Sequence, residues 1–490
     1  MNFSQLLHGA EILAQSGNPS VTGLEYDSRR VKPGDAFIAM RGETSDGNKF
    51  IDKVIAAGAV AVVTDSASES PREGVAWVQV PHGRRALARL SANFYKRPAE
   101  RLAITGITGT NGKSTTAFLL EAIFSAVNRK SALIGTIEYH VAGKILPAPH
   151  TTPEALDLNR ILADALGNGA TEAVMEVSSH ALAQQRVYGI PFDVAVFTNL
   201  TRDHLDYHKT LEEYFIAKRR LFEGTGAVAP GAAVINRDDE YGKQLAGLAG
   251  RTLTYGLEPG ADITTHKPAL SFLGIECIVE TPLGKIEIHS KLVGRANLYN
   301  ILAAVGAGVA LHLSPDIIAA GIAELSAVPG RFERIDLGQP FLVIVDYAHT
   351  DDALRNLMAT AKQVHPEGRL ITLFGCGGDR DRSKRPLMGE VAGRSSDIVV
   401  LTSDNPRSED PLLIINDVIV GLQRTNAKCL VEPDRKKAIE IALDQARPGD
   451  TVLLAGKGHE TYQVLRDRTI DFDDREVARE VLRQQGYGGN

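Results

Sequence analysis

Short apolar runs of five or six residues alternate with longer amphipathic stretches along most of the chain. In the first hundred residues the apolar runs predict strands at 35–40, 59–64 and 75–80. The amphipathic stretch that follows predicts a helix that begins near Gly83 and ends before Pro98. This alternation is typical of α/β layers, in which helices cover the faces of a sheet.

A second unit begins with a predicted strand at 101–107, a glycine-rich turn and a helix from Lys113. Its further strands are predicted at 173–177, 194–199 and 232–236. The stretch 270–292 differs, because its residues alternate on both sides of a Pro-Leu-Gly turn. That pattern predicts a local antiparallel hairpin.

A domain boundary is predicted near Val328-Pro329-Gly330, where a turn precedes a new strand at 341–346. Later strands at 369–374, 397–402 and 451–455 alternate with helical segments, as in a doubly wound sheet. We therefore expect an α/β fold of three domains. These are a smaller α/β N-terminal domain at 1–100, a central domain at 101–330 with a P-loop-type, mostly parallel sheet, and a C-terminal domain at 331–490 with a Rossmann-like doubly wound sheet.

Composition narrows the functional classes. The 490 residues include 54 Lys and Arg against 60 Asp and Glu, so the net charge is −6 and nucleic acid is not an expected partner. The three cysteines fit a reducing cytoplasm better than a disulfide framework or a zinc site. The N-terminus has no signal-peptide pattern, and no apolar run approaches ~18 residues. We expect a cytoplasmic protein that does not contact a membrane.

The sharpest chemical signal is the segment TGITGTNGKS at 105–114, between a predicted strand and a predicted helix. Glycines let the backbone wrap a phosphate, and the helix N-terminus supplies N–H donors. Lys113 would reach the outer phosphates of a nucleotide, and the Ser114 hydroxyl would bind Mg²⁺. The segment is a variant of the phosphate-loop template, with Ile107 in place of the first glycine. The alternative is an ordinary glycine-rich turn.

Two further segments, MEVSSH at 175–180 and NLTRDHLDYH at 199–208, follow predicted strands. Glu176 could hold Mg²⁺, or could cap a helix or form an ion pair. His204 and His208 have the spacing of a zinc motif, but no Glu follows the first His, which disfavours zinc hydrolysis. From the residues alone, Lys218 in the amphipathic helix 211–222 is interpreted as a solvated cation.

Three loops of the last domain, at 374–385, 402–410 and 455–460, each follow a predicted strand. They should converge at one edge of the sheet. Their mixture of arginines, carboxylates and glycines suits a zwitterionic amino acid, whereas the alternative is a set of surface loops.

Taken in order, GTNGKS, MEVSSHALAQQR, TRDHLDYH, the Lys218 helix, GRANLYN, DYAHT, GCGGDRD and DNPR resemble the Mur ligase family over nearly the whole chain. That family builds the peptide of the bacterial cell wall, in peptidoglycan synthesis. The resemblance implies an ADP-forming acid–amino-acid ligase that uses ATP and Mg²⁺. It also implies that ATP phosphorylates the D-glutamate carboxylate of UDP-N-acetylmuramoyl-L-alanyl-D-glutamate, and that an amino acid then displaces phosphate. The DNPR sequence marks the members that add meso-diaminopimelate.

The resemblance also implies roles for individual residues. The catalytic group comprises Lys113, Glu176, His204 and Lys218. Residues at the ATP site are Gly109, Thr110, Asn111, Gly112, Lys113, Ser114, Thr115, Asn297, Asn300, Arg331 and Asp346. The implied metal ligands are Ser114, Glu176, His204 and Lys218, the last as a carbamate formed with CO₂. Contacts to the muramoyl dipeptide are Ser28, Thr151, Thr152, Ser178, Gln184 and Arg186, and contacts to diaminopimelate are Arg380, Asp404, Asn405, Pro406, Arg407, Gly456 and Glu460.

Arg407 could offer two parallel N–H groups to the extra carboxylate of diaminopimelate, or could simply pair with Asp410. The chain departs from the family pattern at Glu43-Thr44-Ser45, where the relative has a His-Gln pair that contacts uracil. Competing functions are a ligase that adds lysine, the D-Ala-D-Ala dipeptide or folate-linked glutamate, and a P-loop kinase or switch protein. We expect a monomer.

Overall fold

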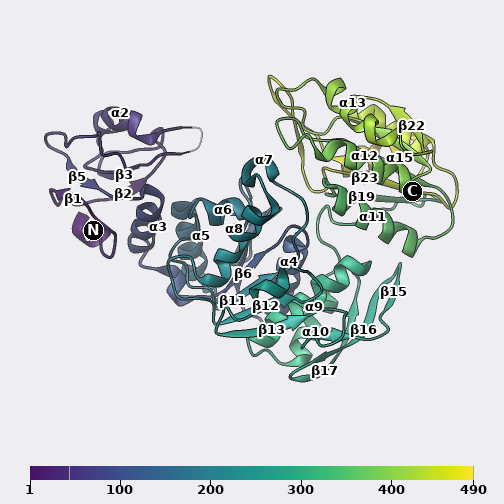
Figure 1. Ribbon diagram of the computed structural model, residues 1–490, viewed down its shortest axis with the longest axis horizontal. Helices are drawn as coiled ribbons and strands as arrows, with labels where there is room; N and C mark the ends of the chain where they lie inside the picture. Colours follow the sequence, from purple (N-terminus) through teal and green to yellow (C-terminus); the bar gives the residue numbers. More distant parts are fainter. Residues whose placement is uncertain (43–44, 489–490) are drawn as a thin grey trace.

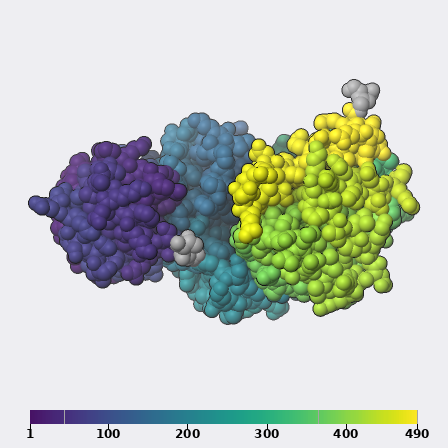
Figure 2. All heavy atoms as spheres, turned by 90° about the horizontal axis from the view of Figure 1, so that it is seen from above, coloured from purple at the N-terminus to yellow at the C-terminus, as the bar shows by residue number. Residues whose placement is uncertain are grey.

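The computed structural model describes residues 1–42 and 45–488. The chain forms three lobes in sequence order, each built around its own sheet (Figure 1). From above, the N-terminal and C-terminal lobes lie on opposite sides of the central one (Figure 2). In these described residues, no helix is both long and apolar enough to cross a membrane.

The N-terminal lobe contains a five-stranded sheet of order β1-β5-β4-β3-β2, in which only β1 is antiparallel to its neighbour. The predicted strands and helix are confirmed as β3, β4, β5 and α3, and the apolar stripe of α3 packs into the core through Leu87 and Leu90. The elements are α1 (Phe3–Leu6), β1 (Ala14–Ser16), β2 (Gly23–Glu25), β3 (Asp35–Ala39), η1 (Gly47–Phe50), α2 (Ile51–Ala56), β4 (Ala61–Thr64), β5 (Ala76–Gln79), α3 (Gly83–Phe94) and η2 (Pro98–Arg101).

The central sheet has eight strands in the order β13-β12-β11-β6-β10-β7-β8-β9. Strands β13 to β7 are parallel, and β8 and β9 add an antiparallel edge that the sequence pattern did not predict. Its elements are β6 (Ala103–Thr108), α4 (Lys113–Ser125), β7 (Ser131–Ile134), β8 (Glu138–Val141), β9 (Lys144–Pro147), α5 (Ala155–Gly167), β10 (Glu172–Glu176), α6 (Ser179–Ala183), β11 (Val194–Phe197), α7 (Leu205–His208), α8 (Leu211–Glu223), β12 (Ala232–Asn236), η3 (Gly242–Leu245) and β13 (Arg251–Tyr255).

A small antiparallel sheet and two helices complete the central lobe. Strands β16 and β17 pair from Ile275↔Ser290 to Thr281↔Gly284, which confirms the predicted hairpin. Apolar residues of α9 and α10 share one core with α4, so the phosphate-loop helix is buried between layers. The elements are β14 (Thr264–Thr265), β15 (Ala269–Ser271), β16 (Gly274–Thr281), β17 (Gly284–Ser290), α9 (Arg295–Ala310) and α10 (Pro315–Glu324).

The C-terminal lobe has a six-stranded sheet of order β18-β19-β23-β20-β21-β22, parallel except for β18. Two separate apolar cores, one with α11 to α13 and one with α14 and α15, flank this sheet, as expected of a doubly wound fold. The elements are β18 (Glu333–Ile335), β19 (Leu342–Asp346), α11 (Asp351–Val364), β20 (Leu370–Phe374), α12 (Lys384–Ser395), β21 (Ile398–Leu401), α13 (Pro411–Leu422), β22 (Lys428–Val431), α14 (Arg435–Asp444), β23 (Thr451–Ala455), β24 (Tyr462–Val464), β25 (Thr469–Asp471) and α15 (Asp474–Gln484).

Candidate functional site

The glycine-rich loop joins β6 directly to α4, with Gly112 as the residue that caps the helix. Gly109 has φ +147° and Gly112 has φ +89°, conformations that favour glycine. A side chain would also collide with Thr198 at the first position and with Asn300 at the second. Both glycines are therefore required by the loop itself, which presents the N-terminus of α4 to an anion.

Lys113 lies at the first position of α4 and folds back over the loop. Its Nζ donates to the Thr110 carbonyl at 2.8 Å and to the Gly109 carbonyl at 3.1 Å. Burial lowers the pKa of Lys113, and Glu176 opposes that effect. The side chain of Lys113 is thus held at the loop, where it is expected to bind a phosphate of the nucleotide.

A cavity of about 240 Å³ is lined by residues of both the central and the C-terminal lobe. The central lobe contributes the phosphate loop and two asparagines of α9, whereas the C-terminal lobe contributes Arg331, Asp346 and His349. Arg331 crosses the boundary, because its Nη2 lies 3.3 Å from the Ser114 hydroxyl. The predicted site residues that line the cavity are Thr110, Asn111, Gly112, Lys113, Ser114, Thr115, Thr151, Glu176, Ser178, His204, Asn297, Asn300, Arg331 and Asp346.

Glu176 ends β10 and is almost completely buried. Its two carboxylate oxygens accept hydrogen bonds from the backbone N–H of Thr136 at 2.8 Å and the Thr136 hydroxyl at 3.0 Å. The carboxylate is therefore fixed at the carboxyl edge of the sheet, beside the phosphate loop. Both side-chain hydrogen bonds of Glu176 that the structure describes come from Thr136. Neither is a helix cap or an ion pair, the two alternatives considered from the sequence.

Apart from Ser28, the residues predicted to bind the dipeptide lie together next to Glu176. The Thr152 hydroxyl donates to the Glu176 carbonyl at 2.8 Å and accepts from the Ser178 N–H at 3.1 Å. Arg186 donates to the Thr152 carbonyl at 2.9 Å and to the Gln184 side chain at 2.8 Å. These contacts join segments at 151–152 and 178–186 into one wall behind the cavity.

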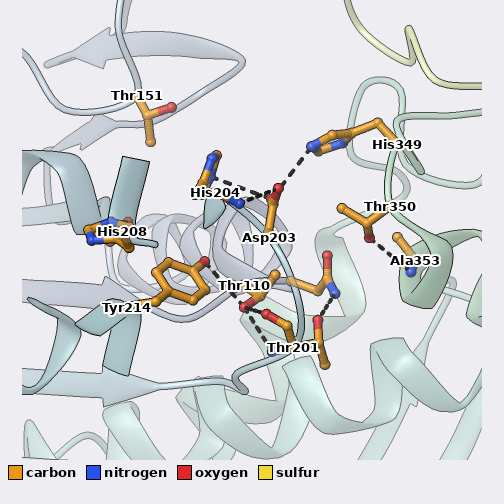
Figure 3. A network of polar contacts seen from close by, with 12 residues as sticks. Thr110, Thr151, Thr201, Asp203, His204, His208, Tyr214, His349, Thr350 and Ala353 are labelled. Atoms are coloured by element: carbon orange, nitrogen blue, oxygen red, sulfur yellow. Dashed lines mark hydrogen bonds and ion pairs between the residues drawn. The ribbon is translucent and has the colours of Figure 1, made fainter. Parts of the chain in front are cut away.

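A second group of polar side chains links the two lobes across the cavity (Figure 3). Asp203 lies between two histidines: its Oδ2 is 3.4 Å from Nε2 of His204 and 3.8 Å from Nε2 of His349 in the C-terminal lobe. Burial opposes the charge of Asp203, but the two histidines and Lys384 outweigh it and lower its pKa. Burial also lowers the pKa of His204, which favours the neutral ring.

Lys218 is buried, with only 1% of its surface exposed. Its Nζ donates to the Gly109 carbonyl at 2.7 Å and lies 4.4 Å from the centre of the Tyr214 ring. Burial lowers its pKa well below the ordinary value, and the charge of Lys113 acts in the same direction. The interpretation of Lys218 as a solvated cation is therefore wrong, because α8 turns this side chain under the phosphate loop.

The oxygen donors at the cavity suit a hard cation such as Mg²⁺. Ser114, Glu176 and His204 all line it, and Lys218 reaches the loop from below. Within residues 1–42 and 45–488, no group of three or more His, Cys, Asp or Glu side chains is arranged to hold a metal ion. Besides Glu176 and His204, a cation here would thus need the Ser114 hydroxyl, solvent and phosphate oxygens, and any carbamate at Lys218 as ligands.

The three loops of the C-terminal lobe converge as predicted, after β20, β21 and β23. A methyl group on Gly377 would lie 3.1 Å from Nη1 of Arg407, 3.7 Å from Cγ of Arg380 and 3.9 Å from Oδ2 of Asp404. A side chain at this position would crowd the Arg407 guanidinium, so the glycine lets the loops after β20 and β21 approach each other closely.

Arg407 has φ +51°, and its Nη1 donates to the Gly378 carbonyl at 2.9 Å and the Asn405 carbonyl at 3.3 Å. Asp410 caps α13 by accepting from the N–H of Leu412 at 2.8 Å. No ion pair joins these two residues in the part of the chain that the structure describes, so the Arg407–Asp410 alternative is not formed.

Models of known families match all three lobes. The Mur ligase family catalytic domain matches residues 20–95, the Mur ligase middle domain 107–308, and the Mur ligase glutamate ligase domain 330–458. The chain belongs to the Mur ligase family. Two relatives are named UDP-N-acetylmuramoyl-L-alanyl-D-glutamate–2,6-diaminopimelate ligase. The relative from Solibacter usitatus (strain Ellin6076) is 55% identical over 99% of both chains. The relative from Geobacter metallireducens (strain ATCC 53774 / DSM 7210 / GS-15) is 48% identical over 98% of this chain and 99% of the relative. A solved structure of a ligase of the same name is 34% identical and covers 99% of both chains, with a TM-score of 0.68.

Some predicted residues of this Mur ligase lie away from the cavity lining. Gly109, Thr152, Gln184, Arg186 and Lys218 support the lining from behind, and Ser28 lies in the N-terminal lobe after β2. Arg380 is exposed, and the departure at Glu43 and Thr44 lies outside the described residues. In the amino-acid loops, Glu460 accepts from the Asn405 side chain at 3.0 Å, and Pro406 and Gly456 belong to the same loops.

The sequence interpretation of this Mur ligase missed several residues. Thr136 holds both oxygens of Glu176, and Asp203 and His349 bridge the lobes. Tyr347 packs under Arg331, with 4.7 Å between the guanidinium carbon and the ring centre. Asp203, Tyr347 and His349 belong to the TRDHLDYH and DYAHT motifs, so their position next to strand ends could have marked them as site residues. No feature of the sequence marked Thr136 as a site residue.

Proposed function

We propose that this Mur ligase uses ATP to join meso-diaminopimelate to the D-glutamate of UDP-N-acetylmuramoyl-L-alanyl-D-glutamate, a step of peptidoglycan precursor synthesis. One observation carries the proposal. The central lobe holds a buried phosphate loop, the C-terminal lobe holds a cluster of cations and carboxylates on three loops, and these two lobes line a shared cavity. The relatives named for this reaction support the choice of substrates.

In the proposed reaction, an oxygen of the D-glutamate carboxylate attacks the γ-phosphorus of ATP, the bond to the ADP oxygen breaks and an acyl phosphate forms. The amine nitrogen of diaminopimelate then attacks the acyl carbon, phosphate leaves and the amine loses a proton. Both partners of the first step are anions, so cations must lie between them. Lys113 and Arg331 line the cavity and are proposed to lie between these two anions, and Asn297, Asn300 and Asp346 are proposed to hold the adenosine.

Ser114, Glu176 and His204 are proposed to hold Mg²⁺, with Lys218 as a carbamate that supports a second ion. When bound, Mg²⁺ supplies positive charge to the phosphate oxygens. Carbamylation joins an unprotonated Nζ to the carbon of CO₂ and releases a proton. The lowered pKa of Lys218 supports it, because only the neutral amine reacts.

The dipeptide is proposed to lie along Thr151, Thr152, Ser178, Gln184 and Arg186, with Ser28 reaching the uridine from the N-terminal lobe. The order of the sheets supports three domains at 1–100, 101–330 and 331–490. A monomer in the cytoplasm remains our expectation.

The choice of amino acid follows from Arg407 and its surroundings. Diaminopimelate differs from lysine by a carboxylate beside its distal ammonium, and a guanidinium can bind a carboxylate through two N–H groups. With lysine bound, Arg407 would face an ammonium without its anion. A site built around such a contact can reject the analogue that lacks it by ~10⁴-fold.

The test measures ADP release against a panel of amino acids, with and without the muramoyl dipeptide. We expect release only with the dipeptide and meso-diaminopimelate together, and loss of the preference over lysine in Arg407→Ala. The exposed Arg468→Ala, on the same lobe, is the control and should keep the preference. ADP release without an amino acid would favour the kinase or switch alternative, and equal use of lysine would favour a lysine-adding ligase.

A further inference from the structure

Lys457 is a buried cation in the amino-acid loops to which the proposed reaction gives no role. It follows β23 in the segment Gly456-Lys-Gly-His-Glu460, and its side chain is 0% exposed. Its Nζ lies 3.0 Å from Oε2 of Glu460, 3.3 Å from Oδ1 of Asn405 and 3.5 Å from Oδ1 of Asp404. A buried ammonium is costly unless such partners surround it, so its position is fixed by these three acceptors.

The three partners belong to both loops of the proposed amino-acid site. Asn405 is itself held, since its Oδ1 accepts from the N–H of Val464 at 2.9 Å and its Nδ2 donates to Glu460 at 3.0 Å. Gln463 donates to the Asp404 carbonyl at 2.7 Å. One ammonium therefore joins the loop after β21 to the loop after β23.

We propose that Lys457 is a positioning residue that holds Glu460, Asp404 and Asn405 as one unit with a net charge of −1, matched to the single distal ammonium of the amino acid. The charge follows from two carboxylates and one ammonium. This proposal rests on the proposed function, because it assigns the unit to the substrate's distal ammonium.

The electrostatics of Glu460 agree with this role. Burial raises the pKa of Glu460 and Asp404 adds to that rise, whereas Lys457 lowers it. Without the lysine, the two carboxylates would face each other uncompensated, and one would take up a proton near neutral pH. Other charged or titratable groups near Glu460 include His459, whose pKa is lowered by burial, and Arg475, which donates to the His459 carbonyl. Arg435, which pairs with Asp474, and the phenols of Tyr347 and Tyr462, with Arg407 beside Tyr462, also lie nearby.

The experiment compares meso-diaminopimelate with 2-aminopimelate, which keeps the distal carboxylate but lacks the distal amine. In Lys457→Met we expect the KM for diaminopimelate to rise about 10- to 100-fold at pH 7, as when a hydrogen bond to a charged group is lost. The KM should fall as pH rises and Glu460 ionises, an inflection that the wild type lacks. The preference over 2-aminopimelate should shrink, and the KM for ATP should not change.

A second variant covers the case in which Lys457→Met does not fold. Lys457→Met/Asp404→Asn removes the second carboxylate, which raises the pKa of Glu460, so Glu460 carries the charge of −1 without competing for a proton. We expect this variant to fold and to regain part of the preference for diaminopimelate. Lys436→Met, which removes an exposed lysine of the same lobe, is the control. An unchanged KM for diaminopimelate in folded Lys457→Met, or a rise with no new pH inflection, would overturn the proposal. So would a folded double variant without the preference. A wild type that does not use diaminopimelate would instead refute the proposed function.

Discussion

Removal of Asp474 should destabilise the C-terminal lobe far more than removal of an exposed partner on the same pair of helices. Arg435 of α14 and Asp474 of α15 are both 0% exposed and form two bonds, at 2.8 Å and 2.7 Å. Asp474→Ala leaves the guanidinium buried with two carbonyl partners, and leaving such a charge unpaired costs about 3–5 kcal/mol. Glu480→Gln breaks the exposed Lys436–Glu480 pair between the same helices and should cost less than about 1 kcal/mol.

The same substitution should weaken binding of the amino acid. Arg435 donates to the carbonyls of Ser403 at 3.2 Å and Ala455 at 2.9 Å, the residues immediately before Asp404 and Gly456. An unpaired Arg435 is free to shift, so both loops lose a fixed anchor. We expect the KM for diaminopimelate to rise in Asp474→Ala and to stay unchanged in Glu480→Gln.

The stability is best measured by hydrogen exchange of the amides in β23. The single tryptophan, Trp77, lies in β5 of the N-terminal lobe, so its fluorescence does not report on α14 and α15. A cost of 3–5 kcal/mol corresponds to roughly 10²- to 10⁴-fold faster exchange. Equal exchange rates in Asp474→Ala and Glu480→Gln would refute the reasoning that a desolvated charge pair dominates this interface.

Three further predictions concern single side chains. Lys113→Ala should reduce ADP release by ~10²–10³-fold in a protein with unchanged circular dichroism, and wild-type release would contradict the assignment of the phosphate loop. Wild type in labelled CO₂ at neutral pH should show a carbamate signal by carbon NMR that is absent from Lys218→Ala; identical spectra would argue against the modification. At His140, burial opposes the charge, but the carboxylates of Glu121 and Glu138 outweigh it and raise its pKa to about 9. Its contribution to stability is therefore complete below pH ~6.5 and is lost as pH rises through about 9, so unfolding of wild type and His140→Gln should differ most at low pH and converge at high pH.

Apart from the hairpin β16–β17, the strands found from the sequence lie in the interior of a sheet. Runs such as 194–199 and 451–455 are buried on both faces, and their continuous apolar residues stand out from the flanking helices. Among the strands that were missed, β1, β8, β9 and β22 lie at or beside sheet edges, where exposed residues interrupt the pattern. The buried interior strand β7 was missed as well. An edge strand is specified by its neighbour more than by its own composition.

The sequence by itself determined which chemistry is available and in what order it occurs. The segment from Gly109 to Ser114 predicts a phosphate site, because its glycines, the start of a helix and a lysine can all be recognised from the local sequence. The convergence of the last three loops also followed from strand order. In contrast, Lys218 and Lys457 look like ordinary cations in the sequence, and only packing shows that both are buried. The contact of Asp203 with His349 joins residues from different lobes. Such properties depend on desolvation and on distances between remote segments, which only the tertiary structure decides.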